Sequence, residues 1–157
     1  MIIHIDMDGV MCNYKEGHDI MKKLVPSLKY PQKGIAFWTR LKPIVGAIEA
    51  VNKLREVHDV YILSAPSTYN PASYSGKRIW VKEHFDIDLA DRLILCNYKG
   101  LLRGDVLIDD NRTGKGQESS KVGLCYLVLI NFLPGKKYWK YCYEKRLLER
   151  SPHSLEK

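Results

Sequence analysis

The chain has 157 residues, of which 45% are hydrophobic, 27% are charged and 10% are aromatic. This composition excludes a mostly disordered, collagen-like or low-complexity protein, and the length fits one globular domain over residues 1–157. Lys and Arg outnumber Asp and Glu by 25 to 18, for a net charge of +7, which suits an anionic partner such as nucleic acid or a phosphorylated small molecule.

Short apolar runs and helical patterns alternate along the chain and predict an α/β fold. The runs are rich in Ile, Val and Leu without polar alternation, which is typical of parallel strands buried on both faces. The helical patterns place apolar residues three and four positions apart, as at residues 44, 48, 51 and 54. Strand, helix and strand in turn predict a parallel sheet with right-handed crossovers. In chain order we expect strands at residues 1–5, 60–63, 92–96, 106–108 and 124–132, with helices at 44–57, 77–85 and 137–148.

Residues 11–42 interrupt this alternation and are too long for a simple connection. They hold an apolar patch at Ile20, Met21, Leu24 and Val25, followed by two prolines. We interpret residues 14–42 as a small helical cap inserted after the first strand. Residues 150–157 are predicted to be a frayed end.

The four cysteines, at positions 12, 96, 125 and 142, form no CxxC pair and match no zinc-site spacing. We therefore expect reduced thiols and a cytoplasmic location. No basic region followed by a long apolar stretch opens the chain, and the longest apolar run, at 124–133, is too short to span a bilayer. Neither a signal peptide nor a membrane partner is predicted.

Polar residues follow four of the predicted strands, at the sheet edge where open parallel sheets bind ligands. A single Asp in such a place is usually a turn residue or a helix cap. Carboxylates after two separate strands, with a Ser and a Lys after two others, are harder to explain in that way. The residues concerned are Asp6, Asp8, Ser64, Lys99, Asp109 and Asp110.

Gathered carboxylates repel one another unless a cation lies among them, and an oxygen-only donor set without His or Cys favours Mg²⁺. Mg²⁺ shares its coordination shell with phosphate, and Lys99 and Ser64 add a positive charge and a hydroxyl donor. A carboxylate beside the metal can attack phosphorus, while a carboxyl two residues further on can protonate the leaving oxygen.

These segments carry a resemblance to a known superfamily. Asp6-Met7-Asp8-Gly9-Val10 resembles the DxDGV signature of the haloacid dehalogenase-like (HAD-like) phosphohydrolases. Leu63-Ser64-Ala65-Pro66 resembles their second motif, and Lys99 with Asp109-Asp110 resembles the third and fourth. Within that superfamily, Phe37-Trp38 and residues 62–66, 73–81 and 107–110 resemble segments of the 5′(3′)-deoxyribonucleotidases, and the likeness covers roughly residues 1–117. The resemblance implies a Rossmann-like three-layer core with a small helical cap after the first strand.

The resemblance also implies roles for single residues. Asp6 would be the nucleophile that forms an aspartyl-phosphate, and Asp8 the general acid/base, which also binds the metal through its backbone carbonyl. Asp109 would complete the metal shell with support from Asp110, and Ser64 and Lys99 would hold the phosphate.

Three further residues have a family role beside a simpler structural one. Lys77 matches a family lysine that contacts phosphate, but it could equally be a solvated helix residue. Phe37 and Trp38 resemble aromatic residues that pack against the base, although such residues are more often part of a cap core. The tail after Ser119 departs from the family, because it is basic where relatives carry an acidic helix.

Three hypotheses result. The first is a Mg²⁺-dependent phosphomonoesterase that acts on deoxyribonucleoside monophosphates; the second is a HAD-type phosphatase of another small phosphorylated metabolite. The third is a nucleic-acid-binding protein on an enzyme scaffold, which the lysines and aromatics of residues 136–150 favour mildly. The intact set of catalytic residues argues against nucleic acid as the partner. A homodimer is left open.

Overall fold

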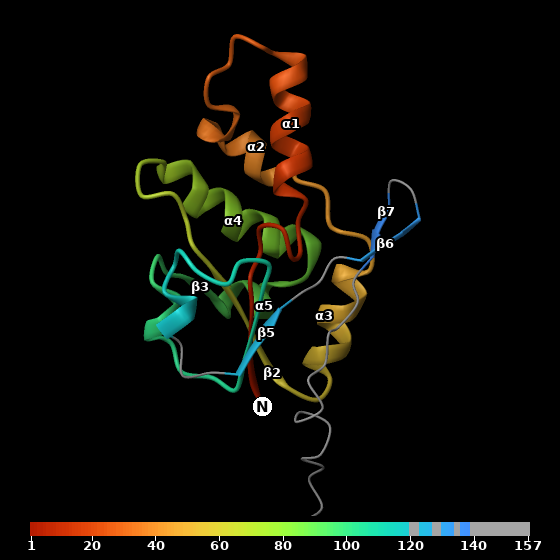
Figure 1. The fold of residues 1–157 in the computed structure, drawn as a ribbon, viewed down its shortest axis with the longest axis vertical. Coiled ribbons are helices and arrows are strands. Elements are labelled where there is room, and N and C mark those ends of the chain that lie inside the picture. Colours follow the sequence, from red (N-terminus) through yellow and green to blue (C-terminus); the bar gives the residue numbers. More distant parts are fainter. Residues whose placement is uncertain (120–122, 127–129, 134–135, 139–157) are drawn as a thin grey trace, which may run out of the picture.

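Five parallel strands form the central sheet of the molecule (Figure 1). The structure, a computed structural model, describes residues 1–119, 123–126, 130–133 and 136–138. The strand order is β3-β2-β1-β4-β5, and every neighbouring pair is parallel. This arrangement confirms the predicted α/β fold class. The strands are β1 (Ile2–Ile5), β2 (Asp59–Ser64), β3 (Leu93–Leu95), β4 (Val106–Asp109) and β5 (Gly123–Tyr126).

Strand β1 lies at the centre of the sheet, and its position decides where the candidate site forms. It pairs with β2 on one side and with β4 on the other, so that Ile3 lies opposite both Val60 and Val106. These residues belong to the buried core, as expected for apolar runs covered on both faces. The residues that follow β1 and β4 therefore emerge side by side at one edge of the sheet.

Apart from the insertion after β1, three helices connect the first three strands. Helix α3 (Ala47–Arg55) precedes β2, and α4 (Pro71–His84) and α5 (Ile87–Asp91) lie between β2 and β3. Helix α4 begins earlier than predicted because Asn70 caps it, with its side chain accepting a 3.2 Å hydrogen bond from the Ala72 amide. Pro71 at the first helical position is a second signal that a helix starts there. The spacing of apolar residues, on which the prediction is based, contains neither of these two signals.

The insertion after β1 is helical, as the fold class predicts. It consists of α1 (Tyr14–Leu24), the short 3₁₀ helix η1 (Pro31–Lys33) and α2 (Ile35–Thr39), which stand at one end of the molecule above α4 (Figure 1). Helix α2 packs closely on α4 because Gly76 has no side chain: a Cβ there would lie 2.8 Å from Cγ of Trp38. The cap is thus seated on the helix that carries Lys77.

The C-terminal part differs from the prediction. The apolar run at 124–132 is not one strand: β5 ends at Tyr126, and β6 (Ile130–Leu133) pairs antiparallel with β7 (Lys136–Tyr138) in a separate sheet. Strand β5 ends together with its partner, because the last residue of β4, Asp109, pairs with Tyr126. The predicted helix at 137–148 is wrong at its start, which lies in β7. Its remainder and the predicted frayed end lie outside the described residues.

Within the described ranges, no helix has the length and apolar character needed to cross a membrane.

Candidate active site

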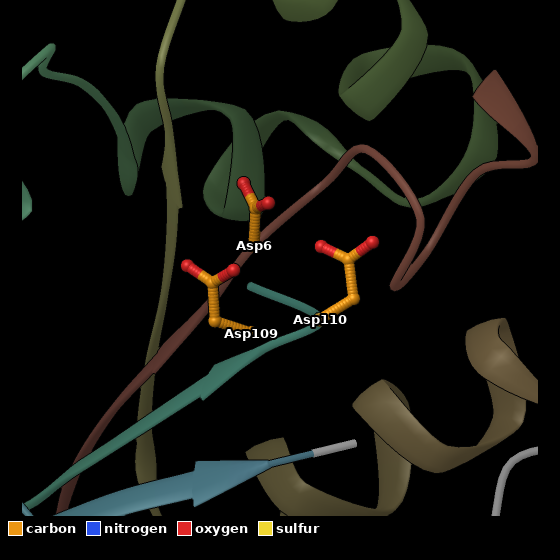
Figure 2. A group of neighbouring side chains, drawn as sticks. All are labelled: Asp6, Asp109 and Asp110. Carbon is orange, nitrogen blue, oxygen red and sulfur yellow. The ribbon is translucent and has the colours of Figure 1, made fainter. Parts of the chain in front are cut away.

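Three carboxylates gather at the carboxyl ends of β1 and β4, and Figure 2 shows them projecting from the strand ends into a common space. Asp6 directly follows β1, Asp109 is the last residue of β4, and Asp110 comes next. Each residue offers an oxygen within 4.8 Å of the others. A 2.8 Å hydrogen bond from the Asp6 amide to the Ile108 carbonyl fixes the two strand ends together.

A buried lysine joins two of these carboxylates. Lys99, in the 3₁₀ helix η2 (Lys99–Leu101), places its Nζ 2.6 Å from Oδ2 of Asp109 and 3.0 Å from Oδ1 of Asp6. Burial alone would lower the pKa of Lys99, but the two carboxylates outweigh it and raise that pKa. Lys99 is therefore a fixed positive charge at the floor of the site.

Asp6 has an unusual electrostatic environment. Burial raises its pKa to about 6, with Asp109 and Asp8 adding to the rise and Lys99 opposing it. Its Oδ1 atom is buried and contacts Lys99, yet it has no hydrogen-bond partner of good geometry among the described residues. Burial and the neighbouring Asp109 likewise raise the pKa of Asp110. The cluster therefore holds more negative charge than its buried partners satisfy.

The Asp8 carboxylate lies on the other side of the site and is held at both oxygens. The fully buried Lys77 places its Nζ 2.6 Å from Asp8 Oδ2 and 3.0 Å from Ser64 Oγ. The Cys12 thiol lies 3.6 Å from Asp8 Oδ1. The Lys77 ammonium also lies 5.0 Å from the centre of the Trp38 ring. Lys77 thus faces the site and is not a solvated helix residue, as the sequence would equally have allowed.

Gly9 permits the turn that brings the first strand's carboxylates to Asp110. Its φ of +79° lies in the left-handed region, and a Cβ there would overlap the Asp110 carboxylate, 2.8 Å from its Cγ. For Gly9→Ala we expect about 1 to 2 kcal/mol of backbone strain and about 10²-fold less phosphate release, because Asp110 must move. Thermal unfolding and phosphate assays check this. Gly34→Ala is the control, because its Cβ would meet nothing within 4 Å; equal activity of both variants would contradict the expectation.

The loop after β4 supplies contacts that the sequence motifs did not indicate. Both oxygens of Asp109 are occupied: Oδ1 accepts a 2.8 Å bond from the Asn111 amide, and Oδ2 accepts a 3.2 Å bond from Nε2 of the buried Gln117. No spacing rule predicts that a Gln eight residues after an Asp will be buried against it. The loop therefore closes around Asp109 and orients its carboxylate.

Two adjoining cavities surround these residues. The first, about 290 Å³, is lined by the candidate site residues Asp6, Asp8, Ser64 and Lys99 together with the loop after β4. The second, about 320 Å³, is lined by Trp38, Tyr14 and residues 65–69, and it shares Asp8 with the first.

The two predicted cap aromatics face different spaces. Trp38 lines the cavity beside Asp8, although only 3% of its surface is exposed. Phe37 instead lines a separate apolar cavity of about 500 Å³ within the cap. The structure thus brings Trp38 to the site, and the predicted contact of Phe37 with a substrate base stays a prediction.

Comparison with known proteins points to one family. The profile of a family described as 5′ nucleotidase, deoxy (pyrimidine), cytosolic type C protein matches residues 28–126, which is more than half of the chain. The match includes α4 with Lys77, Ser64 at the end of β2, Asp109 at the end of β4 and the following Asp110.

Individual relatives carry related names. The chain is 37% identical over 121 residues to a provisionally named 5′(3′)-deoxyribonucleotidase of Vibrio phage KVP40, which covers 74% of this chain and 70% of the phage protein. It is 35% identical over 86 residues to the cytosolic-type 5′(3′)-deoxyribonucleotidase of Homo sapiens, covering 54% of this chain and 43% of the human protein. It is 31% identical to the mitochondrial 5′(3′)-deoxyribonucleotidase of Mus musculus, covering 73% of this chain and 66% of that protein.

Proposed function

Since the chain belongs to the 5′ nucleotidase, deoxy (pyrimidine), cytosolic type C family of the HAD-like superfamily, we propose that it is a Mg²⁺-dependent phosphomonoesterase of deoxyribonucleoside monophosphates that acts through an aspartyl-phosphate. The observation that carries this proposal is the meeting of Asp6, Asp109 and Asp110 around the buried Lys99. That combination supplies a carboxylate nucleophile, a metal site and a fixed positive charge in one cavity.

The residues present fit Mg²⁺. The donor set consists of carboxylate oxygens without His or Cys, which this hard cation prefers. The unsatisfied Oδ1 of Asp6 and the raised pKa values of Asp6 and Asp110 are what a cation would relieve. Asp6, Asp109, Asp110 and the backbone carbonyl of Asp8 would hold the ion, and bound Mg²⁺ would neutralise charge on the phosphoryl oxygens.

The chain's own side chains then perform the transfer. A carboxylate oxygen of Asp6 attacks phosphorus; the ester P–O bond breaks, and the leaving oxygen takes a proton from Asp8. In the second step the Asp8 carboxylate accepts a proton from water, whose oxygen attacks phosphorus and releases inorganic phosphate and free Asp6. Lys99 and Ser64 stabilise the charge on the phosphoryl oxygens throughout.

The adjoining cavity supports a nucleoside as the leaving group. Trp38 and Tyr14, whose ring centres lie 5.6 Å apart, form an aromatic wall beside Asp8 against which a base can pack. A sugar phosphate would leave this wall without a partner. The names of the relatives agree with this choice. The cytoplasmic location and a homodimer stay predictions.

Phosphate release from a panel of monoesters tests the proposal. We expect 5′- and 3′-deoxyribonucleoside monophosphates to be hydrolysed faster than sugar phosphates, with activity lost in EDTA and regained when Mg²⁺ is added in excess. Activity that persists in EDTA would remove the metal from the proposal, and faster turnover of sugar phosphates would favour the other metabolite class. Absence of hydrolysis together with salt-sensitive binding of single-stranded nucleic acid would favour the binding protein.

A further inference from the structure

Lys115 lies where the two cavities of the site meet. Of the described basic residues, it alone lines both the cavity with the carboxylates and the cavity with the aromatic wall. It belongs to none of the sequence motifs. If the phosphate of a substrate occupied the first cavity and its nucleoside the second, a cation at this junction would lie beside the bond that joins them.

The other two lysines of the site are already engaged by carboxylates. Lys99 contacts Asp6 and Asp109, and Lys77 contacts Asp8. Both are at least 98% buried, whereas Lys115 is exposed, and no ion pair of its side chain occurs among the described residues. The positive charge of Lys115 is therefore available to a ligand, while the charges of the other two are offset within the protein.

The backbone of Lys115 is held firmly although its side chain is exposed. Its amide donates a 2.7 Å hydrogen bond to Oε1 of Gln117, and its carbonyl accepts a 2.7 Å bond from the Lys99 amide. Gln117 in turn donates to Asp109. The same network that orients the Asp109 carboxylate thus fixes where the Lys115 side chain begins.

We infer that Lys115 is a substrate-binding residue that attracts and holds the phosphate dianion from the open side of the cleft, and so favours charged monophosphates over uncharged nucleosides. This inference rests on the proposed function. Lys115 acts on binding and takes no part in bond making, because the buried lysines already occupy the places beside Asp6 and Asp8. An exposed cation also raises the rate of encounter with anions in a salt-dependent way.

The test compares wild type with Lys115→Ala, Lys115→Arg and the control Lys82→Ala, which removes an exposed lysine of α4 that lines neither cavity. In Mg²⁺ buffer we expect Lys115→Ala to weaken inorganic phosphate binding, measured by calorimetry, about tenfold. The KM for a deoxyribonucleoside monophosphate should rise similarly while kcat changes less than about twofold. Lys115→Arg should restore both values, and inhibition by an uncharged deoxynucleoside should stay unchanged.

The inference and the proposed function can fail separately. If wild type binds phosphate but hydrolyses no monoester, the proposed function fails, and the phosphate arm still decides the role of Lys115. Unchanged phosphate affinity in Lys115→Ala would overturn the inference, as would a loss confined to kcat. Equal weakening in Lys82→Ala would show only the effect of net charge and would overturn it too. Thermal unfolding of each variant separates these outcomes from misfolding.

Discussion

Asp6→Asn is expected to abolish phosphate release, with a loss of about 10⁴-fold or more. The amide has the shape of the carboxylate but cannot attack phosphorus, so no aspartyl-phosphate forms. Rapid acid quenching followed by mass spectrometry should find one added phosphoryl group on wild type and none on the variant. Asp91→Asn, the same change at an exposed residue that ends α5, is the matched control and should keep full activity.

Although Asp6→Asn should lose its activity, its thermal stability should not fall. The folded-state pKa of Asp6, about 6, lies above its ordinary value of 3.8, so the folded protein disfavours the ionised carboxylate. This cost is absent below pH 3.8 and fully present above pH 6. Without metal at pH 7.5, Asp6→Asn should therefore unfold at the same or a higher temperature than wild type, because Lys99 keeps its ion pair with Asp109. A variant that is both inactive and clearly less stable would contradict this account, because misfolding would then explain the lost activity.

Much of the fold could be predicted because its decisive signals are local. Apolar runs such as those of β1 and β4 can be recognised from residue types alone. Because the carboxyl ends of parallel strands lie at the same edge of a sheet, these runs also predict where the site forms. The single strand predicted at 124–132 is wrong because a run of apolar residues does not show where one strand ends and another begins. In the structure β5 ends at Tyr126, which pairs with the last residue of β4, a contact between strands that the run itself does not report.

Some residues of the candidate site could likewise be predicted from the sequence, whereas others could not. Asp6, Ser64, Lys99 and Asp109 each end a strand or lie close after one, so topology alone predicted that they would meet. Gln117 lies in a loop whose path depends on hydrogen bonds to Asp109, and no periodicity reports such contacts. Side-chain partners such as the one that Lys77 finds in Asp8 likewise depend on how α4 packs against the sheet and cap.

Lys99→Met should have a double effect, on catalysis and on stability. Without the ammonium, the phosphoryl charge loses a fixed donor, and phosphate release should fall about 10²- to 10³-fold. The change also leaves Asp6 and Asp109 buried without their shared cation. Breaking a buried pair on one side costs about 3 to 5 kcal/mol, so the metal-free variant should unfold roughly 10 °C lower.

Mg²⁺ should repair part of that stability, because a divalent cation supplies the charge that the variant lacks. The rise of Tm on adding Mg²⁺ should therefore be larger for Lys99→Met than for wild type, although activity stays low. Lys82→Met, the same change at an exposed position of α4, should behave like wild type in both measurements. If Mg²⁺ raises the Tm of Lys99→Met no more than that of the control, then the cation does not compensate for the lost ammonium. If Mg²⁺ raises the Tm of neither variant, then the buried carboxylates do not share a cation site.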